Sequence, residues 1–415
     1  MKGKSGKLFI FSSILTFLLA MFFSQCIDKD KPKADIRGTA YADPATCIKC
    51  HKEVYTNYNQ TGHYHASQPV AANHLQAGIA ATDSQFVFND SVKIKVEKRK
   101  SGLYQVAYFK GKKVRDERFD IAFGSAEKAQ TYAYWRGKKI YQLPLTYSTS
   151  AHNWVNSPGY PANLVYYNRL VVGRCFECHA SFADRKFVAT GGLTVDEEFD
   201  KDAMLYGIDC QRCHGPAANH VNYHTENPGD KQPKFIKPYK SLTRQQKLDM
   251  CGVCHSGSDL KAERSTFNFH PGDTLMNFFD PAFGAVNHDP DVHGNQTKLL
   301  AMSKCFANSA TMTCTTCHSS HEKETGNLVG YSQKCMTCHK AEDHNFCKMA
   351  PKLGDAITTK CVDCHMPALP SKVISFKMTD AKETSPYLLR THRIAIYPEQ
   401  TAGVLQMLKN NHNKR

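Results

Sequence analysis

The chain has 415 residues, and its 53 Lys and Arg against 38 Asp and Glu give a formal net charge of +15. Such a basic balance ordinarily favours nucleic-acid contacts, but the 17 cysteines and 20 histidines indicate a different chemistry. Beyond the N-terminal segment no stretch is long and apolar enough to cross a bilayer, which excludes a protein embedded in the membrane.

The N-terminus has the pattern of an export signal. Three lysines within the first seven residues precede a mainly apolar run from Leu8 to Phe23, which is the order found in signal peptides. We expect residues 1–25 to be a lipoprotein-type signal peptide, Cys26 to be the lipidated first residue of the exported protein, and residues 26–44 to be a solvated tether. Gln25 stands where a small residue is usual, so an uncleaved membrane anchor is the alternative.

Seven copies of the pattern Cys-x-x-Cys-His follow, numbered here as motifs 1 to 7 in chain order. They lie at Cys47, Cys50 and His51; Cys175, Cys178 and His179; Cys210, Cys213 and His214; Cys251, Cys254 and His255; Cys314, Cys317 and His318; Cys335, Cys338 and His339; and Cys361, Cys364 and His365. Two thiols at this spacing can add to the two vinyl groups of one porphyrin, and the adjacent histidine then reaches the iron. Paired cysteines also suit zinc, but zinc does not require the histidine that every copy carries. The sequence therefore predicts seven covalent haems c, each with its motif histidine as proximal iron ligand.

These cofactors change the meaning of the charge. Without the three lysines of the signal segment the chain carries +12, and seven haems bring fourteen propionate carboxylates. The net charge is then about −2 with all irons reduced and about +5 with all irons oxidised. We therefore expect no nucleic-acid partner.

The spacing of the motifs divides the exported chain. Residues 45–85 form a first haem segment, and residues 86–165 have no motif and form a β-rich insert. Residues 166–300 hold motifs 2 to 4, residues 301–396 hold motifs 5 to 7, and residues 397–415 form a C-terminal tail helix.

The insert is predicted to be β-rich from its pattern. Val92–Glu97 alternates apolar and charged residues, Ser101 and Gly102 favour a turn, and Leu103–Phe109 is rich in strand-forming residues. Further strands are expected over Tyr132–Trp135 and Ile140–Leu145.

Outside the insert the sequence predicts short helices and loops, for example a helix over Thr243–Met250. Haem faces can supply the hydrophobic core, so regular structure can be sparse. The expected fold class is mainly α with sparse secondary structure around a covalent haem array, plus the β-rich insert, an α+β arrangement.

Two cysteines of the exported body lie outside the motifs. Cys305 and Cys347 could form a disulfide, since an oxidising compartment favours one. Two buried free thiols are the alternative.

Thirteen histidines remain for the distal side of the irons, enough for bis-histidine coordination throughout. His321 has the best local case, because it lies three residues after His318 and can ligate a neighbouring iron. The distal candidates are His63, His220, His293, His321, His344 and His392. Weaker candidates for a seventh ligand are His65, His74, His152, His224, His270 and His288, whereas His412 is expected to be solvated. For each one the alternative is a surface histidine or a hydrogen-bond partner of a propionate.

A family resemblance follows from these motifs and the residues around them. Two regions resemble the cytochrome c-554 and c-prime type of multihaem cytochromes. The first is motif 1 followed by Thr61-Gly62-His63. The second is motif 3, with Gly207-Ile208-Asp209 before it and Gly215-Pro216 after it. Other matching segments are Phe123-Gly124-Ser125, Gln130-Thr131-Tyr132, Tyr141-Gln142-Leu143-Pro144, Ser157-Pro158-Gly159-Tyr160, His293-Gly294, Cys364-His365-Met366-Pro367 and His392-Arg393-Ile394. The resemblance extends from about residue 40 to residue 396.

The resemblance implies a compact, mostly bis-histidine haem array. Its positions for distal ligands match His63, His220, His293, His321 and His392. Some relatives are electron carriers, and others oxidise or reduce small nitrogen or sulfur compounds at one open haem. Every motif here ends in histidine, so the lysine-ligated site of ammonia-forming nitrite reductases is absent from the sequence.

The expected function is single-electron transfer between redox partners of the cell envelope, either other cytochromes or a membrane quinol-linked complex. The protein is expected on the periplasmic side, attached to the inner or outer membrane through lipidated Cys26, with no catalytic residue assigned. One alternative is an oxidoreductase with one five-coordinate haem, for which Tyr64, Tyr132, Arg136, His152 and Tyr160 could supply polar groups. Another is a surface lipoprotein whose β insert docks a second cytochrome.

Overall fold

The computed structural model describes residues 34–70, 84–161, 163–257, 260–280, 289–343, 346–379 and 381–412. The expected signal peptide, Cys26 and the first part of the tether lie outside these residues, as do His74, His288, His344 and the side chain of His412. Among the described residues, no helix combines the length and the apolar character needed to span a bilayer.

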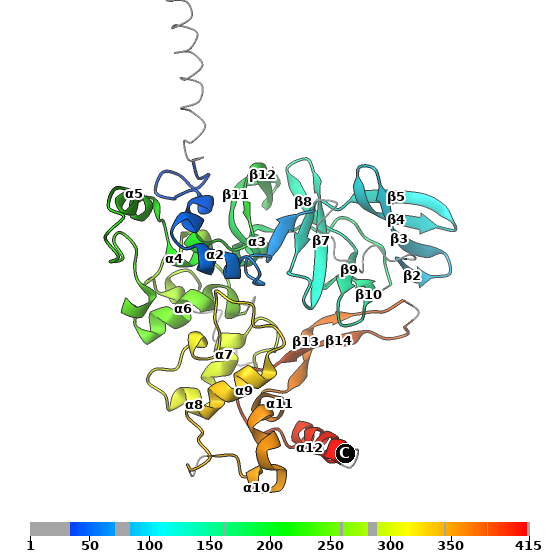
Figure 1. Ribbon diagram of the computed structural model, residues 1–415. Coiled ribbons are helices and arrows are strands. Elements are labelled where there is room, and N and C mark those ends of the chain that lie inside the picture. Colours follow the sequence, from blue (N-terminus) through cyan, green and yellow to red (C-terminus); the bar gives the residue numbers. More distant parts are fainter. Residues whose placement is uncertain are drawn as a thin grey trace, which may run out of the picture.

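Two antiparallel sheets occupy the interval between motifs 1 and 2, on the right of Figure 1. One has the strand order β1-β6-β7-β9-β10, with β8 paired to β7, and the other has the order β2-β3-β4-β5. Their bounds are β1 Ser67–Pro69, β2 Gln85–Asn89, β3 Val92–Arg99, β4 Gly102–Phe109, β5 Lys112–Arg118, β6 Ile121–Phe123, β7 Ala129–Arg136, β8 Lys139–Gln142, β9 Leu145–Ser148 and β10 Asn153–Asn156. The strands predicted at Val92–Glu97 and Leu103–Phe109 are confirmed as β3 and β4.

The two sheets share an aromatic core. Ile94 of β3 and Phe86 of β2 lie in one cluster with Tyr132 of β7 and Trp154 of β10, and all four are almost fully buried. The ring of Phe119 stacks on Tyr132 with the centroids 4.5 Å apart. In β3 the alternation is clear, with Ile94 buried between the half-buried Lys93 and Lys95, as expected for a strand with one buried face. The insert thus has an apolar core built from side chains alone.

A second cluster joins the insert to motif 2. Phe176, inside that motif, is fully buried and packs against Phe123 of β6, with ring centroids 5.3 Å apart. Ile121 and Ile140 belong to the same cluster. Motif 2 is therefore held against the sheet of β6 to β8.

The helices are short, and most of them carry or flank a motif (Figure 1). They are α2 Lys52–Tyr58, α3 Gly173–His179, α4 Cys210–His214, α5 Ala218–Glu226, α6 Arg244–His255, α7 Gln296–Ala301, α8 Lys304–Ala307, α9 Leu328–Met336, α10 Ala350–Leu353, α11 Cys361–His365 and α12 Pro398–His412, with 3-10 turns η2 Pro44–Lys49, η4 Tyr239–Ser241, η5 Thr266–Asn268, η6 Leu275–Asn277, η8 Cys314–Thr316 and η9 Gly354–Thr359. The predicted helix at Thr243–Met250 is confirmed as α6, which Thr243 and Gln246 begin with a capping box.

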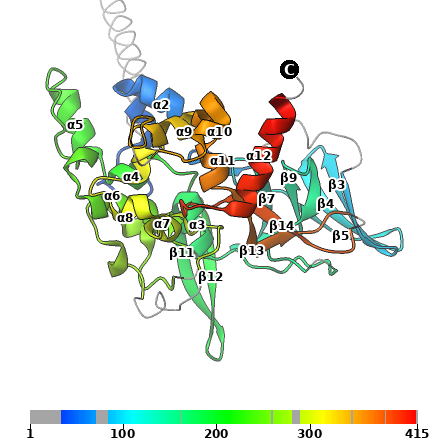
Figure 2. The same cartoon turned by 90° about the horizontal axis from the view of Figure 1, so that it is seen from below.

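The expectation of a mainly α fold is wrong. Helix and strand contents are nearly equal, at 29% and 28%, because two antiparallel ribbons also lie outside the insert. They are β11 Ala180–Gly191 with β12 Thr194–Tyr206, and β13 Ala368–Phe376 with β14 Ser385–Arg390. The physical reason is that motif helices such as α4 end at the motif histidine. The chain after motif 2 and the chain after motif 7 then fold back and pair as antiparallel strands. Gly191 and Gly192, both with positive φ, form the β11–β12 turn, and Figure 2 shows that hairpin projecting from the body.

The second ribbon connects motif 7 to the insert. β13 begins three residues after His365. Near its far end the amide of Lys377 donates to the side-chain oxygen of Asn156, and the amide of Val87 donates to Thr379 Oγ1 over 2.7 Å. The chain that leaves the C-terminal motif is therefore hydrogen-bonded to both sheets of the insert.

Gly207 provides a test of how closely motif 3 is packed on the segment after motif 1. Its φ is +66°, and a Cβ atom would collide with the backbone carbonyl oxygen of Tyr64. We predict that Gly207→Ala lowers the free energy of unfolding by about 3 kcal/mol or more, since left-handed strain and overpacking add. Gly111→Ala is the matched control, because φ is +78° there and nothing lies within 4 Å. Equal losses in guanidinium denaturation would contradict the prediction.

Candidate haem-binding sites

Four histidine pairs stand out among the described residues, and each joins a motif histidine to one from a distant segment. The ring centroids are 6.4 Å apart for His51 and His220, 6.2 Å for His255 and His63, 6.0 Å for His214 and His321, and 6.2 Å for His318 and His392. The pairs thus combine motifs 1, 4, 3 and 5 with four of the predicted distal ligands.

These separations suit one iron between two imidazoles. A histidine nitrogen binds a first-row metal at about 2 Å and lies about 1 Å from its own ring centre, so imidazoles on opposite sides of one metal have centroids about 6 Å apart. Rings in direct stacking contact would be much closer. Iron ligation by these pairs remains a prediction, and their spacing fits it.

Hydrogen bonds at Nδ1 leave Nε2 of two motif histidines and of one paired histidine available for a metal. Nδ1 of His179 donates to the Ala66 carbonyl over 3.1 Å, and Nδ1 of His365 donates to the Ala395 carbonyl over 2.8 Å. On the distal side, Nδ1 of His220 donates to the Lys234 carbonyl over 2.8 Å. A donor bond of this kind fixes the tautomer and the ring orientation of a ligating histidine.

Two of the paired histidines, His63 and His392, have the protonation state that a metal requires. Burial, with His255 nearby, lowers the pKa of His63 to about 4. Burial and the neighbouring His318 lower the pKa of His392 to about 4 as well. Above that pH both rings are neutral, and neutral imidazole is the form that binds iron.

The remaining three motifs are less fully assigned. His293 is close enough to His179 of motif 2 to lower its pKa, after the larger effect of burial, so His293 stays the expected distal ligand there. For motifs 6 and 7, the candidate His344 lies outside the described residues. The distal ligand expected for a seventh iron is therefore not assigned.

Motif cysteines meet across motif boundaries. Side-chain hydrogen bonds join Cys47 to Cys210, Cys178 to Cys254, Cys251 to Cys314, and Cys335 to Cys361. Motif 1 thus contacts motif 3, motif 4 contacts both 2 and 5, and motif 6 contacts motif 7. Groups attached to these sulfurs would be close neighbours.

Buried polar atoms without a partner lie beside the motifs. They include Nε of Arg174 and Arg212, each next to a motif cysteine, and Oγ of Ser332, three residues before Cys335. Buried polar atoms normally have hydrogen-bond partners, so these atoms fit a polar group such as a haem propionate. The sequence analysis did not identify them, and the only signal was an arginine directly before a motif cysteine.

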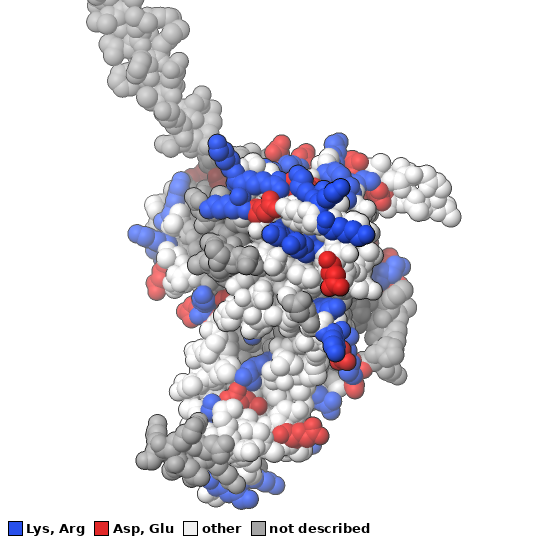
Figure 3. Space-filling view, turned by 90° about the vertical axis from the view of Figure 1, so that its right-hand side faces the viewer, with Lys and Arg blue, Asp and Glu red and all other residues white. Residues whose placement is uncertain are grey.

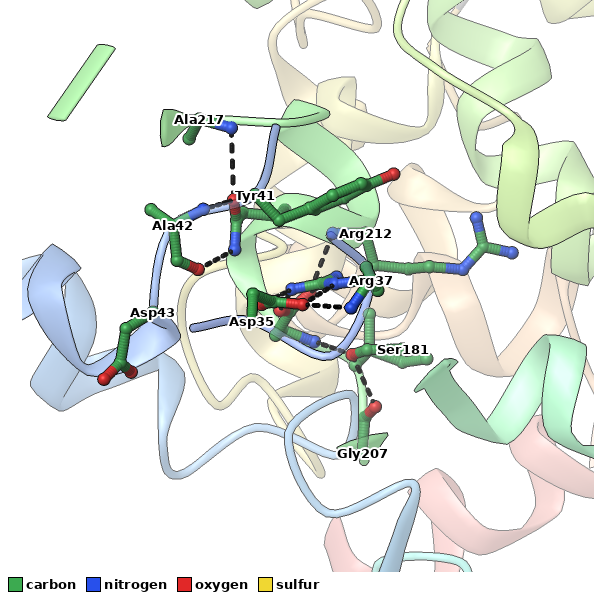
Figure 4. A network of polar contacts seen from close by, with 12 residues as sticks. Asp35, Arg37, Tyr41, Ala42, Asp43, Ser181, Gly207, Arg212 and Ala217 are labelled. Atoms are coloured by element: carbon green, nitrogen blue, oxygen red, sulfur yellow. Dashed lines mark hydrogen bonds and ion pairs between the residues drawn. The ribbon is translucent and has the colours of Figure 1, made fainter. Parts of the chain in front are cut away.

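Figure 4 shows how the segment before motif 1 is fixed to motif 3. Nη2 of Arg37 lies 2.6 Å from a carboxylate oxygen of Asp209 and 2.8 Å from one of Asp35. Asp209 also begins α4 by accepting from the Arg212 amide over 2.8 Å. Gln211 bonds the amide and carbonyl of Ala42. Motifs 1 and 3 are thereby held side by side.

The weaker histidine candidates have other surroundings. His224 lies 4.6 Å from His220 between ring centroids, His65 lies 5.1 Å from Tyr64, and Nε2 of His270 lies 3.3 Å from the hydroxyl of Tyr41. His152 is exposed in a turn with a φ of +48°.

The residues proposed for an open catalytic haem are used elsewhere. Tyr132 is buried in the core of the insert and donates to Gln130, and Tyr160 donates to the carbonyl of Gln142. Arg136 covers the ring of Tyr141 at 4.0 Å. These contacts hold the three side chains in the insert, and they point the three toward different groups.

Cys305 and Cys347 are both free thiols. Cys305 is near enough to Cys317 to raise the pKa of that thiol, after the larger effect of burial, whereas Cys347 acts in the same way on Cys364. The expected disulfide is not formed, because the two cysteines lie beside different motifs. In the described part of the chain, no three Cys, His, Asp or Glu residues gather around a possible metal position.

The comparisons with known proteins agree with this arrangement. The family model for cytochrome c554 and c-prime matches residues 159–215, which include motifs 2 and 3. Among solved structures, the outer cell wall cytochrome OcwA is similar with a TM-score of 0.53 and 15% sequence identity, over 88% of this chain and 81% of that chain. At this identity the likeness shows the fold. No curated protein sequence matches the chain.

His321 provides a direct test of the pairing. We predict that His321→Ala leaves one iron per molecule without its distal imidazole, so that a high-spin signal of about one haem appears in the electron paramagnetic resonance spectrum. His152→Ala is the control, because that exposed histidine belongs to none of the four pairs. An unchanged low-spin spectrum for His321→Ala would show that the pair holds no iron.

Arg37 provides a test of the contact between the N-terminal segment and motif 3. Its side chain is 5% exposed and that of Asp35 is fully buried. We predict that Arg37→Ala costs about 3 kcal/mol of unfolding free energy, since two carboxylates lose their cation. Arg99→Ala removes a cation from a more exposed group, with a side chain 31% exposed, and should cost less than about 1 kcal/mol. The prediction fails if chemical denaturation ranks the two variants the other way.

Proposed function

We propose that this chain, a multihaem c-type cytochrome, carries single electrons along seven covalently attached haems between redox partners outside the cytoplasm. Haem iron supplies the one-electron chemistry. The chain's own residues hold each iron site on two sides and bring the motifs into contact.

The four histidine pairs carry this proposal. A pair such as His51 and His220 would hold one iron with both imidazoles and would leave no position there for a substrate. Electron transfer needs no bond to form or break, and two fixed ligands limit the rearrangement that accompanies it. The same donor bonds at Nδ1 that orient the rings also tune the potential.

The contacts between motifs support a continuous route. Cysteine contacts place motif 2 beside 4, motif 4 beside 5, motif 1 beside 3 and motif 6 beside 7. The segment after motif 5 supplies His321 to the motif 3 histidine His214, which joins 5 to 3. His392 pairs with His318 of motif 5.

Motif 5 is thereby a junction. The backbone that follows His392 returns to motif 7, where the Ala395 carbonyl accepts from Nδ1 of His365. Motif 5 connects to motifs 4 and 2, to motifs 3 and 1, and to motifs 7 and 6, and His63 after motif 1 also pairs with His255 of motif 4. Electrons entering at any motif can therefore reach the others.

We further propose that the protein is exported and anchored by a lipid on Cys26 at the periplasmic side of the envelope. The N-terminal sequence pattern supports this, and the similar solved structure is described as an outer cell wall cytochrome. Its partners would be other cytochromes or a membrane quinol-linked complex.

The test is an electron paramagnetic resonance spectrum of the oxidised protein, quantified against iron and haem. Seven irons per chain, all low-spin after magnetic coupling is taken into account, are expected for an electron conduit. Addition of carbon monoxide to the reduced protein should then leave the optical spectrum unchanged. A stoichiometric high-spin signal together with carbon monoxide binding would instead establish an open iron and favour an oxidoreductase.

A further inference from the structure

The sheet of β2 to β5 concentrates positive charge. Its residues 85–118 include ten Lys or Arg and four Asp or Glu, a net charge of +6 in a segment of 34 residues. Figure 3 shows Lys and Arg gathered over the upper part of the side of the molecule where this sheet lies. Lys93 and Lys95 stand on one face of β3, and their strand partners are Tyr108 and Val106.

The lysines carry most of the charge that is available to a partner. The arginines of this sheet have carboxylate neighbours: Arg99 contacts Glu97 at 3.0 Å, and Arg115 contacts Glu117 at 2.8 Å. By contrast, none of the following lysines has an ion pair within the part of the chain that the structure describes: Lys93, Lys95, Lys98, Lys100, Lys110 and Lys112.

The cofactors do not cancel this charge. All seven motifs lie outside residues 52–174, so propionates attach elsewhere. The rest of the exported chain carries +6, which seven haems would bring to about −8 when all irons are reduced. The haem number rests on the proposed function. The protein then has a positive sheet beside a negative haem region, a separation that orients charged partners before contact.

Apolar side chains lie among these cations. Phe109 is 48% exposed and Val114 is 62% exposed, and Lys112 is the strand partner of Phe109. Protein interfaces combine apolar contacts with charged ones. A polyanionic chain or a lipid headgroup needs only the charge, so the pattern favours a folded protein.

We propose that the outer surface of β2 to β5, the cationic sheet, is the docking surface for an acidic redox protein. Its unpaired lysines steer the partner, and Phe109 and Val114, exposed near the β4–β5 turn at the end of the sheet, contact the partner's surface. β2 touches the end of the ribbon that starts at motif 7, through the bond from the Val87 amide to Thr379. A partner docked on the cationic sheet therefore lies beside the β13–β14 ribbon, which starts at motif 7.

The test measures binding of an acidic probe, a plant-type ferredoxin, to the full-length holoprotein by calorimetric titration at about 10 mM and about 150 mM salt. The variant Lys93→Glu/Lys95→Glu/Lys112→Glu should weaken binding at low salt about tenfold or more. The variant Lys348→Glu/Lys352→Glu/Lys372→Glu makes the same charge change at exposed lysines of the haem region and should stay within about twofold of the wild type.

Each other outcome overturns the proposal. Equal weakening in both variants would show a general charge effect, and no weakening would show that ferredoxin binds elsewhere. The sheet would be assigned to a lipid or polymer if the wild type bound phosphatidylglycerol vesicles or polyphosphate more tightly than ferredoxin and the first variant lost that binding. Self-association at low salt that the first variant abolishes would make the partner a second copy. Haem content and the low-spin spectrum, recorded for every variant, report separately on the proposed electron-transfer function.

Discussion

The arrangement depends on one feature: a motif supplies a single histidine, and in four motifs a second histidine from another part of the chain lies about 6 Å from it between ring centroids. The second histidine comes from another part of the chain, as when His63 pairs with His255 and His392 pairs with His318. Each such pair joins two segments that are distant in sequence. The helices around the motifs can therefore be as short as α4, because the fold does not depend on their packing alone.

The insert follows a different principle. Its two sheets bury a core of aromatic and aliphatic side chains between them, including Trp154 and Tyr132, and need no cofactor for it. Phe176 inside motif 2 joins the two parts by packing against the insert. The molecule thus combines a region in which histidine pairs join distant segments with a region organised by the hydrophobic effect, and the boundary between them lies at motif 2.

Much of this arrangement could be predicted from the sequence, and the part that could not has physical reasons. The spacing of the Cys-x-x-Cys-His motifs predicts the proximal histidines. The pattern of apolar and polar residues predicts strands β3 and β4. The pairing of distal His63 with motif 4 cannot be read from spacing, because it depends on how the whole chain folds. The hairpin of β11 and β12 was missed although Gly191 and Gly192 favour a turn, because the expectation of haem-filled cores outweighed the local signal. Arg174 and Arg212 were missed because an arginine inside or beside a motif has no distinctive pattern.

The pairing between distant segments also sets an order for biogenesis. Motif 1 lies far before its partner His220 in the sequence, and motif 3 lies far before His321. Because a chain is made from its N-terminus, neither pair can form until the later segment has been made. The early motifs therefore stay open until the segments that bear His220, His321 and His392 are present.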